Sequence, residues 1–444
     1  MVKKKRLQNC NKKFIVIVSV LIVLALTFSI VTSHVQRNKE SEVNSLVIYH
    51  WWPSVGEQVA FNALLDLFIE RNPETLIISA PLQGESANKL RRAKELIEPL
   101  IVADEAPDIL QLHTGYGTKE YYDAGLLEPV TSSWEDANLD STTPLMIKFM
   151  CKFDDDYYCL PMNVHRTNVV WYNKHVLDDA KINSNEIKTW DDFFSACDKI
   201  RNSGIEYPVQ IAEAWTVQHT FDQIIASVGI DFYEDWINGN ISSVSDERLL
   251  EAFDIFEKYI SYANLDSALI GWDVAAKRII DGESAFYVMG DWVNAEFVVE
   301  EKIYDVDYGT FMVPETENMY GLVMDAFQIS RNSKHITNAK KWIDIVASGE
   351  GQDVFNPLKG SIPIRRDAVV NKYGSYQKSA IYDFGVTDIM YPALSSGAPK
   401  SFELAMQNIL AEYVLDMNKD AAIEKIVAQI NDTKDEYVIE WNLD

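Results

Sequence analysis

The chain lacks the short motifs that mark the common catalytic and metal centres. Its 444 residues contain no HExxH, no CxxC pair, no GxSxG and no GxxxxGK[ST]. A zinc peptidase, a structural zinc site, a nucleophile-elbow hydrolase and a P-loop nucleotidase are therefore not expected. The seven histidines are scattered along the chain, without the close spacing of metal ligands. We expect no metal and no cofactor.

Two short runs come close to known sites but do not match them. GYGTKE, at residues 115–120, lacks the third glycine of a dinucleotide-binding loop. The three aspartates at residues 154–156 lack the ligand spacing of an EF-hand, and we interpret them as a solvated hairpin turn. Glycosidases, in contrast, need only two carboxylates in a cleft. With 67 Asp and Glu residues in the chain, an exported carbohydrate-active hydrolase stays open as an alternative function.

Positive charge is scarce outside the first few residues. Six of the 40 Lys and Arg residues precede Phe14, which leaves 34 against 67 Asp and Glu in the rest of the chain. Such an acidic surface repels nucleic acid and anionic lipid, so we expect no nucleic-acid partner. Apolar residues make up 47% of the chain, which is enough for a large core.

One uncharged apolar run, FIVIVSVLIVLALTFSIVT at residues 14–32, follows the basic cluster. Its 19 residues are long for a signal peptide core and close to the ~20 that span a bilayer. Small side chains at Val31 and Ser33 offer a cleavage site. Residues 1–33 are therefore either a cleaved signal peptide or a retained membrane anchor, and the length favours the anchor. The basic cluster predicts that the rest is extracytoplasmic, in the periplasm or on the outer face of the cytoplasmic membrane.

Cysteine is nearly absent, with four residues in the chain. Cys10 precedes the apolar run, and Cys197 has apolar neighbours at helical spacing, which indicates a core thiol. A hairpin folded about Asp155 would place Cys151 directly opposite Cys159, within the range that a disulfide spans. In an oxidising compartment we therefore predict a Cys151–Cys159 disulfide. A register shift of one residue would instead leave two reduced thiols packed on the sheet.

Short apolar strands alternate with helical patterns from Leu46 onward. The order strand, helix, strand, helix, strand predicts an α/β fold with a mostly parallel sheet flanked by helices. In such sheets, ligands lie at the carboxyl ends of the strands. Residues 50–52, 83–85 and 113–115 follow three successive predicted strands, so we expect them at one edge of the sheet.

Aromatic residues are abundant, with 11 Trp and 21 Tyr. Several tryptophans stand beside a turn or a small residue: Trp51, Trp52, Trp215, Trp272 and Trp292. A single tryptophan in such a place is more often part of the core. Several of them together with His113, Asp325 and Lys359 favour a binding site. Sugars suit such a site, because their C–H faces stack on indole rings and their hydroxyls need carboxylate, amide and lysine partners.

Five longer runs carry a family likeness. APDILQLHTGYGTKEYYDAGLLEPV, NVHRTNVVWYNKHVL, ESAFYVMGDWVNAEF, GLVMDAFQIS and GQDVFNPLKGSIPIR resemble, in this order, segments of the ABC-importer extracellular solute-binding proteins of family 1. Within that family, VHRTNVVWYN, EAWTVQHTF and NPLKGSIP are most similar to the glucose- and mannose-binding members. The likeness runs from about Ser45 to the C-terminus.

The resemblance implies a two-lobed periplasmic-binding-protein fold of type II, with a mostly parallel sheet and flanking helices in each lobe. Lobe one would comprise residues 44–163 plus 325–366, and lobe two residues 167–320 plus 370–444. We expect a monomer whose cleft closes on a sugar and docks to an ABC permease. Gram-positive members commonly carry a lipidated cysteine, but no cysteine closely follows Thr32, so anchoring would fall to the apolar segment itself.

The resemblance also implies a monosaccharide site. Carried over position by position, its ligand-binding residues are Glu57, His113, Thr114, Trp272, Trp292, Asp325 and Lys359, with Trp52, Gln83 and Trp215 as further members. The expected function is a receptor that binds a glucose-like monosaccharide and releases it to the permease without catalysis. A ligand-sensing protein that reports to a membrane signalling partner stays open as well, and the sequence does not rank glucose against galactose or mannose.

Overall fold

The structure is a computed structural model that describes residues 44–81, 100–101 and 106–443. The chain divides into two compact units, Met1–Ser45 and Leu46–Asp444. The fold described below is that of the second unit.

The predicted signal peptide or anchor at residues 1–33 lies outside the described residues, as do Cys10 and Gln83. Among the helices in the described ranges, none combines the length and the apolar character needed to cross a membrane. The expectation of an N-terminal membrane segment therefore stays a prediction.

The first lobe is built around a sheet with strand order β2-β1-β3-β14-β4, in which β7 also pairs with β14. The strands are β1 (Ser45–His50), β2 (Leu76–Pro81), β3 (Ile109–His113), β4 (Leu127–Glu128), β7 (Leu160–Pro161) and β14 (Asp325–Ser330). β1 and β3 are parallel, whereas β14 is antiparallel to β3, β4 and β7. The sheet is mixed, but β1, β3, β4 and β7 run in one direction and β14 runs against them. The prediction of a mostly parallel sheet therefore holds for these strands.

The direction of β14 follows from the point where it enters the sheet. Its first residue, Asp325, pairs with His113, the last residue of β3. Because the chain arrives from the second lobe at the edge where β3 ends, β14 runs back antiparallel to β3. The same entry point brings Asp325 and His113 to one edge of the sheet.

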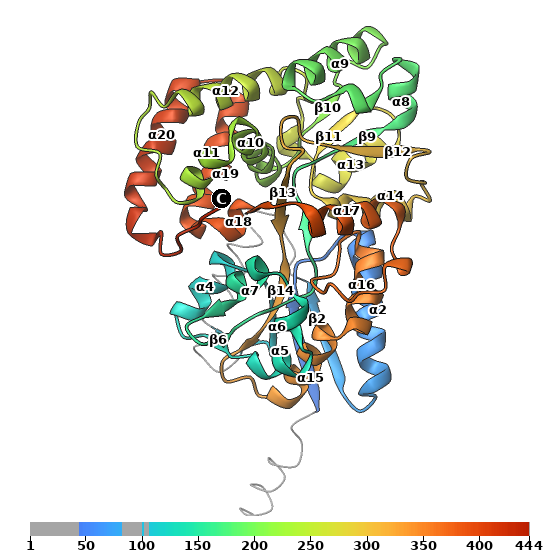
Figure 1. The fold of residues 1–444 in the computed structure, drawn as a ribbon, viewed down its shortest axis with the longest axis vertical. Helices are drawn as coiled ribbons and strands as arrows, with labels where there is room; N and C mark the ends of the chain where they lie inside the picture. The colour runs from blue at the N-terminus through green and yellow to red at the C-terminus, as the bar shows by residue number, and fades with distance from the viewer. Residues whose placement is uncertain (1–43, 82–99, 102–105, 444) are drawn as a thin grey trace, which may run out of the picture. The chain divides into compact units, whose positions relative to one another are not determined.

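Helices surround this sheet (Figure 1). They are α2 (Val55–Arg71), α4 (Tyr116–Asp123), α5 (Thr131–Asp136), α6 (Leu139–Thr142), α7 (Leu145–Cys151), α15 (Ile336–Ala347) and α16 (Gly349–Lys359). The side chains of Trp52, Phe61, Phe327, Trp342 and Phe355 pack between α2, α15, α16 and the sheet, with ring centroids 5.0–6.0 Å apart. This aromatic cluster fixes α2 and α16 relative to the sheet.

The hairpin of β5 (Lys152–Phe153) and β6 (Asp156–Tyr157) has a different register from the one on which the disulfide prediction depends. Lys152 pairs with Tyr157, one residue away from the predicted register, because Asp154 adopts a left-handed conformation with φ 52° and the turn is short. Cys151 is the last residue of α7, and its carbonyl accepts a hydrogen bond from the Tyr158 amide.

Both thiols of the predicted bridge, those of Cys151 and Cys159, are free and buried. Burial and a hydrogen bond to Cys159 raise the pKa of the Cys151 thiol well above its usual range. Buried thiols of this kind behave as small apolar side chains. Cys197 is also a free buried thiol, as the sequence predicts.

The second lobe contains a sheet with strand order β10-β11-β9-β12. Its strands are β9 (Val169–Asn173), β10 (Val209–Gln210), β11 (Phe286–Val288) and β12 (Tyr308–Met312). β10 and β11 are parallel, but β9 is antiparallel to both β11 and β12. This sheet is mixed as well, because β9 enters from the first lobe between strands that run the other way.

The helices of the second lobe and of the C-terminal part are numerous. They are α8 (Lys174–Asp179), α9 (Trp190–Asn202), α10 (Ala214–Val228), α11 (Ile230–Ile237), α12 (Glu247–Ile260), α13 (Trp272–Ile280), α14 (Asn294–Val299), α17 (Ser375–Val386), α18 (Leu394–Gly397), α19 (Lys400–Asp416) and α20 (Lys419–Asp432). Short 3₁₀ helices occur at η1 (Ser184–Glu186), η2 (Ser267–Leu269), η3 (Asp291–Val293), η4 (Val370–Lys372) and η5 (Lys434–Glu436). α10 packs against α11, α12 and α19.

A small sheet joins the lobes. It pairs β13 (Met319–Val323) antiparallel with β8 (His165–Arg166) and parallel with β15 (Ile389–Pro392). β13 continues through Met324 into β14, so one extended segment serves both sheets (Figure 1). The predicted lobe boundaries, 44–163 plus 325–366 and 167–320 plus 370–444, remain a prediction.

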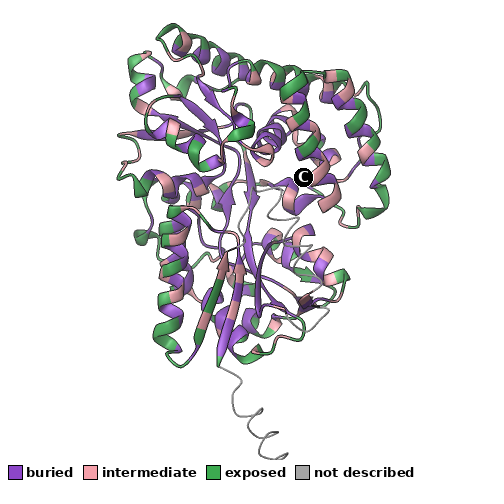
Figure 2. Cartoon of the chain, turned by 180° about the vertical axis from the view of Figure 1, so that it is seen from behind, coloured by how far each residue is buried: buried purple, intermediate pink, exposed green. Residues whose placement is uncertain are grey.

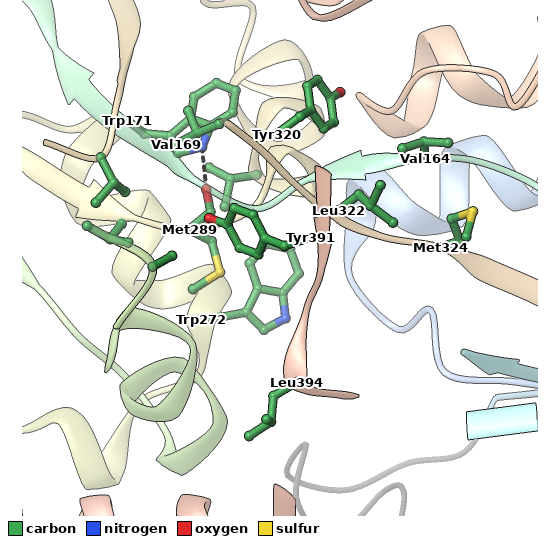
Figure 3. Packing of buried hydrophobic residues seen from close by; sticks show 14 of the residues in the cluster. Val164, Val169, Trp171, Trp272, Met289, Tyr320, Leu322, Met324, Tyr391 and Leu394 are labelled. Carbon is green, nitrogen blue, oxygen red and sulfur yellow. Dashed lines mark hydrogen bonds between the residues drawn. The ribbon is translucent and has the colours of Figure 1, made fainter. Parts of the chain in front are cut away.

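The crossing segments are packed as tightly as the sheets. Val164, Leu322 and Met324 are buried along the strands that join the lobes (Figure 3). Nearby, the Trp171 indole donates a hydrogen bond to the Met289 carbonyl at 2.9 Å. Most strands are buried, while the outer faces of the helices are exposed (Figure 2). A close-packed crossing holds the elements on its two sides in defined positions.

The C-terminal strap, residues 434–443, connects the helices of the second lobe to the first lobe. Its Val438 and Ile439 amides donate to the Tyr116 hydroxyl of α4 at 2.7 and 2.9 Å. Trp441 contacts the Phe149 ring of α7 at 5.4 Å and donates through its indole to the Gly397 carbonyl of α18 at 2.7 Å. The strap ends near α18 (Figure 1).

Candidate functional site

A cavity of about 160 Å³ lies where the first-lobe sheet edge, the crossing strands and the second lobe meet. The first lobe contributes Trp51, Trp52, Glu57, His113, Asp325 and Lys359. The crossing and the segment after β15 contribute His165, Thr167, Val323, Ala393, Leu394 and Ser395. The helices and turns of the second lobe and the C-terminal part contribute Trp215, Gln218, His219, Asp222, Trp272, Trp292, Glu403 and Gln407.

Glu57 and Lys359 form a buried ion pair on the first-lobe wall. A capping box with Ser54 fixes Glu57 in the first turn of α2, and the Lys359 Nζ lies 3.0 Å from the Glu57 Oε1. Lys359 ends α16, and Gly360 follows in a left-handed conformation with φ 89°. A Cβ at Gly360 would lie 2.8 Å from the Asp291 carbonyl oxygen. Glycine is therefore required where this helix end meets the second lobe.

Asp325 is held by amide groups on both of its carboxylate oxygens. Gln111 donates to Oδ1 at 2.9 Å and Asn163 donates to Oδ2 at 3.1 Å. Burial opposes ionisation, but the hydrogen bond and charge of His165 and the charge of Lys359 hold the pKa of Asp325 below its usual range. Asp325 is therefore an ionised, oriented hydrogen-bond acceptor on the cavity wall.

His165 lies between carboxylates from the two lobes. Its Nδ1 is hydrogen-bonded to Asp291 of η3, and its Nε2 lies 3.5 Å from the Asp325 Oδ2. Burial alone would lower the pKa of His165, but the Asp291 carboxylate, together with Asp325, raises it. Asp291 also accepts bonds from the Arg166 amide and the Tyr376 hydroxyl. This chain of polar groups connects the two lobes beside the cavity.

Tryptophan rings line the cavity from both lobes. Trp51 contacts His113 edge-on at 5.0 Å, and Trp292 contacts Trp215 at 5.9 Å and His165 at 5.3 Å. Trp51, Trp215 and Trp292 are only partly buried. Partly exposed indole rings beside ionised and amide groups form a surface suited to a ring-shaped ligand with both apolar faces and polar edges.

The family model for bacterial extracellular solute-binding proteins matches residues 94–353. An uncharacterized ABC transporter extracellular-binding protein of Pyrococcus horikoshii is 34% identical over 96% of this chain and 99% of the relative. The chain belongs to the bacterial extracellular solute-binding proteins. The family resemblance of the sequence is thus confirmed.

Two further comparisons place this solute-binding protein. A probable sugar-binding periplasmic protein of Rhizobium meliloti is 25% identical over 87% of this chain and 94% of its own. The solved structure of the bacterial solute receptor AcbH, described with an exclusive preference for β-D-galactopyranose, matches with a TM-score of 0.77 at 16% identity. That match covers 88% of this chain and 99% of the other, and it shows a shared two-domain α/β fold.

The solute-binding protein brings most of the predicted site residues together. Those that line the cavity are Trp52, Glu57, His113, Trp215, Trp272, Trp292, Asp325 and Lys359. Thr114 is buried and is not among the lining residues. Gln83 lies outside the described residues. The ligand-binding role of each residue stays a prediction.

Sequence reasoning missed the polar end of the cavity. Gln218 and Asp222 on α10, and Glu403 and Gln407 on α19, line it. Each pair is spaced four residues apart, which places both members on one helix face, and this spacing was the available signal. It was not decisive, because a helix pattern shows which face is polar but not what that face meets.

Proposed function

We propose that this solute-binding protein is the extracytoplasmic receptor of an ABC sugar importer and holds one glucose-like monosaccharide in the cavity. The size of the cavity, combined with its lining, carries this proposal. An apolar cavity of roughly 150 Å³ takes one benzene ring, and this polar one is about 160 Å³. That space suits one six-membered ring better than a chain of rings.

The proposed contacts divide by chemistry. Asp325 would accept hydrogen bonds from sugar hydroxyls, since both of its oxygens are already oriented by amides. Lys359, restrained by Glu57 at 3.0 Å, would donate to a hydroxyl oxygen. The rings of Trp215, Trp272 and Trp292 offer faces for the C–H side of the sugar. Trp52, Glu57 and His113 complete the proposed ligand-binding set.

The proposed mechanism is binding and release without chemistry. A sugar that contacts both lobes favours the closed arrangement by population shift, and the closed form would dock to the permease of the importer. The name of the Rhizobium relative supports sugar binding, and that of the Pyrococcus relative supports a role in ABC transport. Residues 1–33 would export the chain and, if retained, anchor it to the membrane. The proposed receptor acts as a monomer.

Titration calorimetry against a sugar panel tests the proposal. Residues 44–444 would be titrated with glucose, galactose, mannose and xylose, and with the trisaccharide raffinose. We expect one sugar per chain and tight binding of at least one hexose, with raffinose much weaker. Product analysis of the same mixtures should show the sugars unchanged. Preference for the trisaccharide would overturn the monosaccharide assignment, and release of a smaller sugar would favour a hydrolase.

A further inference from the structure

The end of the cavity formed by α10 and α19 has polar groups that the first-lobe contacts do not explain. Gln218, His219 and Asp222 come from α10, and Glu403 and Gln407 from α19. All five side chains belong to buried residues, and Gln407 is only 1% exposed. Burying carboxyl and amide groups in a contact between two helices destabilises that contact relative to apolar side chains.

Hydrogen bonds within the cluster and to Trp236 satisfy some of its polar atoms. The Gln218 amide donates to Asp222 Oδ2, and the Trp236 indole donates to Oδ1 at 3.2 Å. The Gln407 amide donates to Glu403 Oε1 at 3.2 Å. Burial raises the pKa of Asp222 well above its usual range.

Two buried atoms of the cluster have no hydrogen-bond partner in the described part of the chain. They are Gln407 Oε1 and His219 Nε2. Burial lowers the pKa of His219 to about 4, and a bond to the Thr167 backbone offsets this only in part. The bond raises the pKa, so the ring donates it to the Thr167 carbonyl. Since Nε2 has no partner, the donor is Nδ1–H, which leaves Nε2 as the acceptor nitrogen of a neutral ring. Both unpartnered atoms are therefore acceptors.

Cationic partners for an anionic ligand are lacking at this end. Among the described residues that line the cavity, Lys359 is the sole Lys or Arg, and Glu57 already pairs with it. Lys400 lies close by on α19 but is bound to Glu403. A carboxylate or phosphate placed here would meet the acceptor atoms Gln407 Oε1 and His219 Nε2 and the buried side chain of Glu403, which is unfavourable.

We propose that the α10–α19 end is a specificity subsite that accepts hydrogen bonds from one hydroxyl-bearing arm of the ligand and excludes sugars with an acidic group on that arm. This rests on the proposed function, because the ring itself would be held by the first-lobe wall and the tryptophans. It narrows the ligand class to uncharged sugars that carry a hydroxyl at this end.

The test measures binding affinity while one protein side chain and one sugar hydroxyl are removed, separately and together. Wild type and Gln407→Met would be titrated with the best hexose of the panel, with its monodeoxy analogues and with its uronic acid. Gln223→Met is the matched control, because Gln223 is a buried glutamine of α10 that binds Tyr391 and is not among the lining residues. Gln407→Met should bind the hexose roughly tenfold more weakly. It should bind one deoxy analogue, the one lacking the hydroxyl held at this end, as well as wild type does.

Each outcome decides the proposal. Gln223→Met should lower thermal stability without changing the ranking of the analogues. Equal losses for every analogue in Gln407→Met, or no loss at all, would overturn the subsite. Wild type alone provides a second measurement that needs no variant: the uronic acid should bind at least roughly a hundredfold more weakly than the hexose, and equal binding would overturn the exclusion. If wild type binds none of the neutral sugars, the proposed function itself fails.

Discussion

The two walls of the cavity differ in the kinds of side chain that form them. On the first-lobe wall, Glu57, Asp325 and Lys359 stand at strand and helix ends, and each is tied to a buried partner. On the second-lobe wall, Trp215 and Trp292 are partly exposed rings held mostly by other rings. The first wall therefore presents fixed charges, and the second, apart from its polar α10–α19 end, presents aromatic rings. A ligand with hydroxyls at its edge and apolar faces would use both.

This difference predicts which substitutions change both stability and sugar affinity, and which change mainly affinity. The charged wall is part of the folded core of its lobe, so changes there should alter both stability and affinity. The ring wall contributes less to the core, so changes there should alter affinity first. Each variant below tests one side of this comparison.

The largest effect is expected for Lys359→Met, which leaves the Glu57 carboxylate buried without its cation. Breaking one side of a buried pair costs about 3–5 kcal/mol of unfolding free energy. Arg71→Met is the control, because the Arg71–Glu350 pair is on the surface and exposed pairs contribute at most about 1 kcal/mol. Urea unfolding of both variants measures the difference, and equal losses would contradict the buried-pair argument.

Two tryptophans offer the next contrast. Trp52 is 1% exposed and packs on Phe61 and Phe355, so Trp52→Leu should cost about 3 kcal/mol of stability. Trp292→Leu should cost less than half of that but reduce sugar affinity by about 1–2 kcal/mol, through a lost stacking face. Thermal unfolding and calorimetry on the same samples measure both quantities. A Trp292 variant that loses stability but not affinity would make this residue part of the core.

Asp325→Asn should weaken sugar binding by about 1–3 kcal/mol. The change keeps the size of the side chain but turns an amide donor toward Gln111 or Asn163, which already donate there. Because the pKa of Asp325 lies below its usual range, the carboxylate stays ionised as the pH falls through about 4. Binding that depends on it should persist to that pH. Asp140→Asn is the control, because it neutralises a carboxylate outside the cavity that accepts a hydrogen bond from the Tyr157 hydroxyl.

The smallest effect is expected for Tyr116→Phe, which removes the acceptor of two strap amides. We expect a loss of about 1 kcal/mol in sugar affinity, with faster dissociation, because these bonds connect the strap to α4 of the first lobe and opening of the cleft is expected to break them. Tyr122→Phe is the control on the same helix, because the Tyr122 hydroxyl binds Asp154 within the first lobe. Stopped-flow tryptophan fluorescence would show the two variants behaving alike if the strap has no role.

The sequence predicts the first-lobe wall better than the second. His113 was found because a strand pattern places it at a strand end, whereas Asp325 came from the family resemblance. The paired register of β3 and β14 brings the two residues together. Gln218 and Gln407 were missed because contacts between helices far apart in the chain leave no local signal. The hairpin register failed at Asp154, where one left-handed residue moves every later partner by one position.

The strap also has a practical consequence for measurement. Residues 438–443 touch Tyr116 and Phe149 on one side and α11 and α18 on the other. A fluorophore attached at the end of the chain would therefore sit at the rim where the two halves approach each other. Its signal should change as the cleft opens, which makes this end a natural position for a reporter dye. By the same reasoning, an affinity tag is better placed at the other end of residues 44–444.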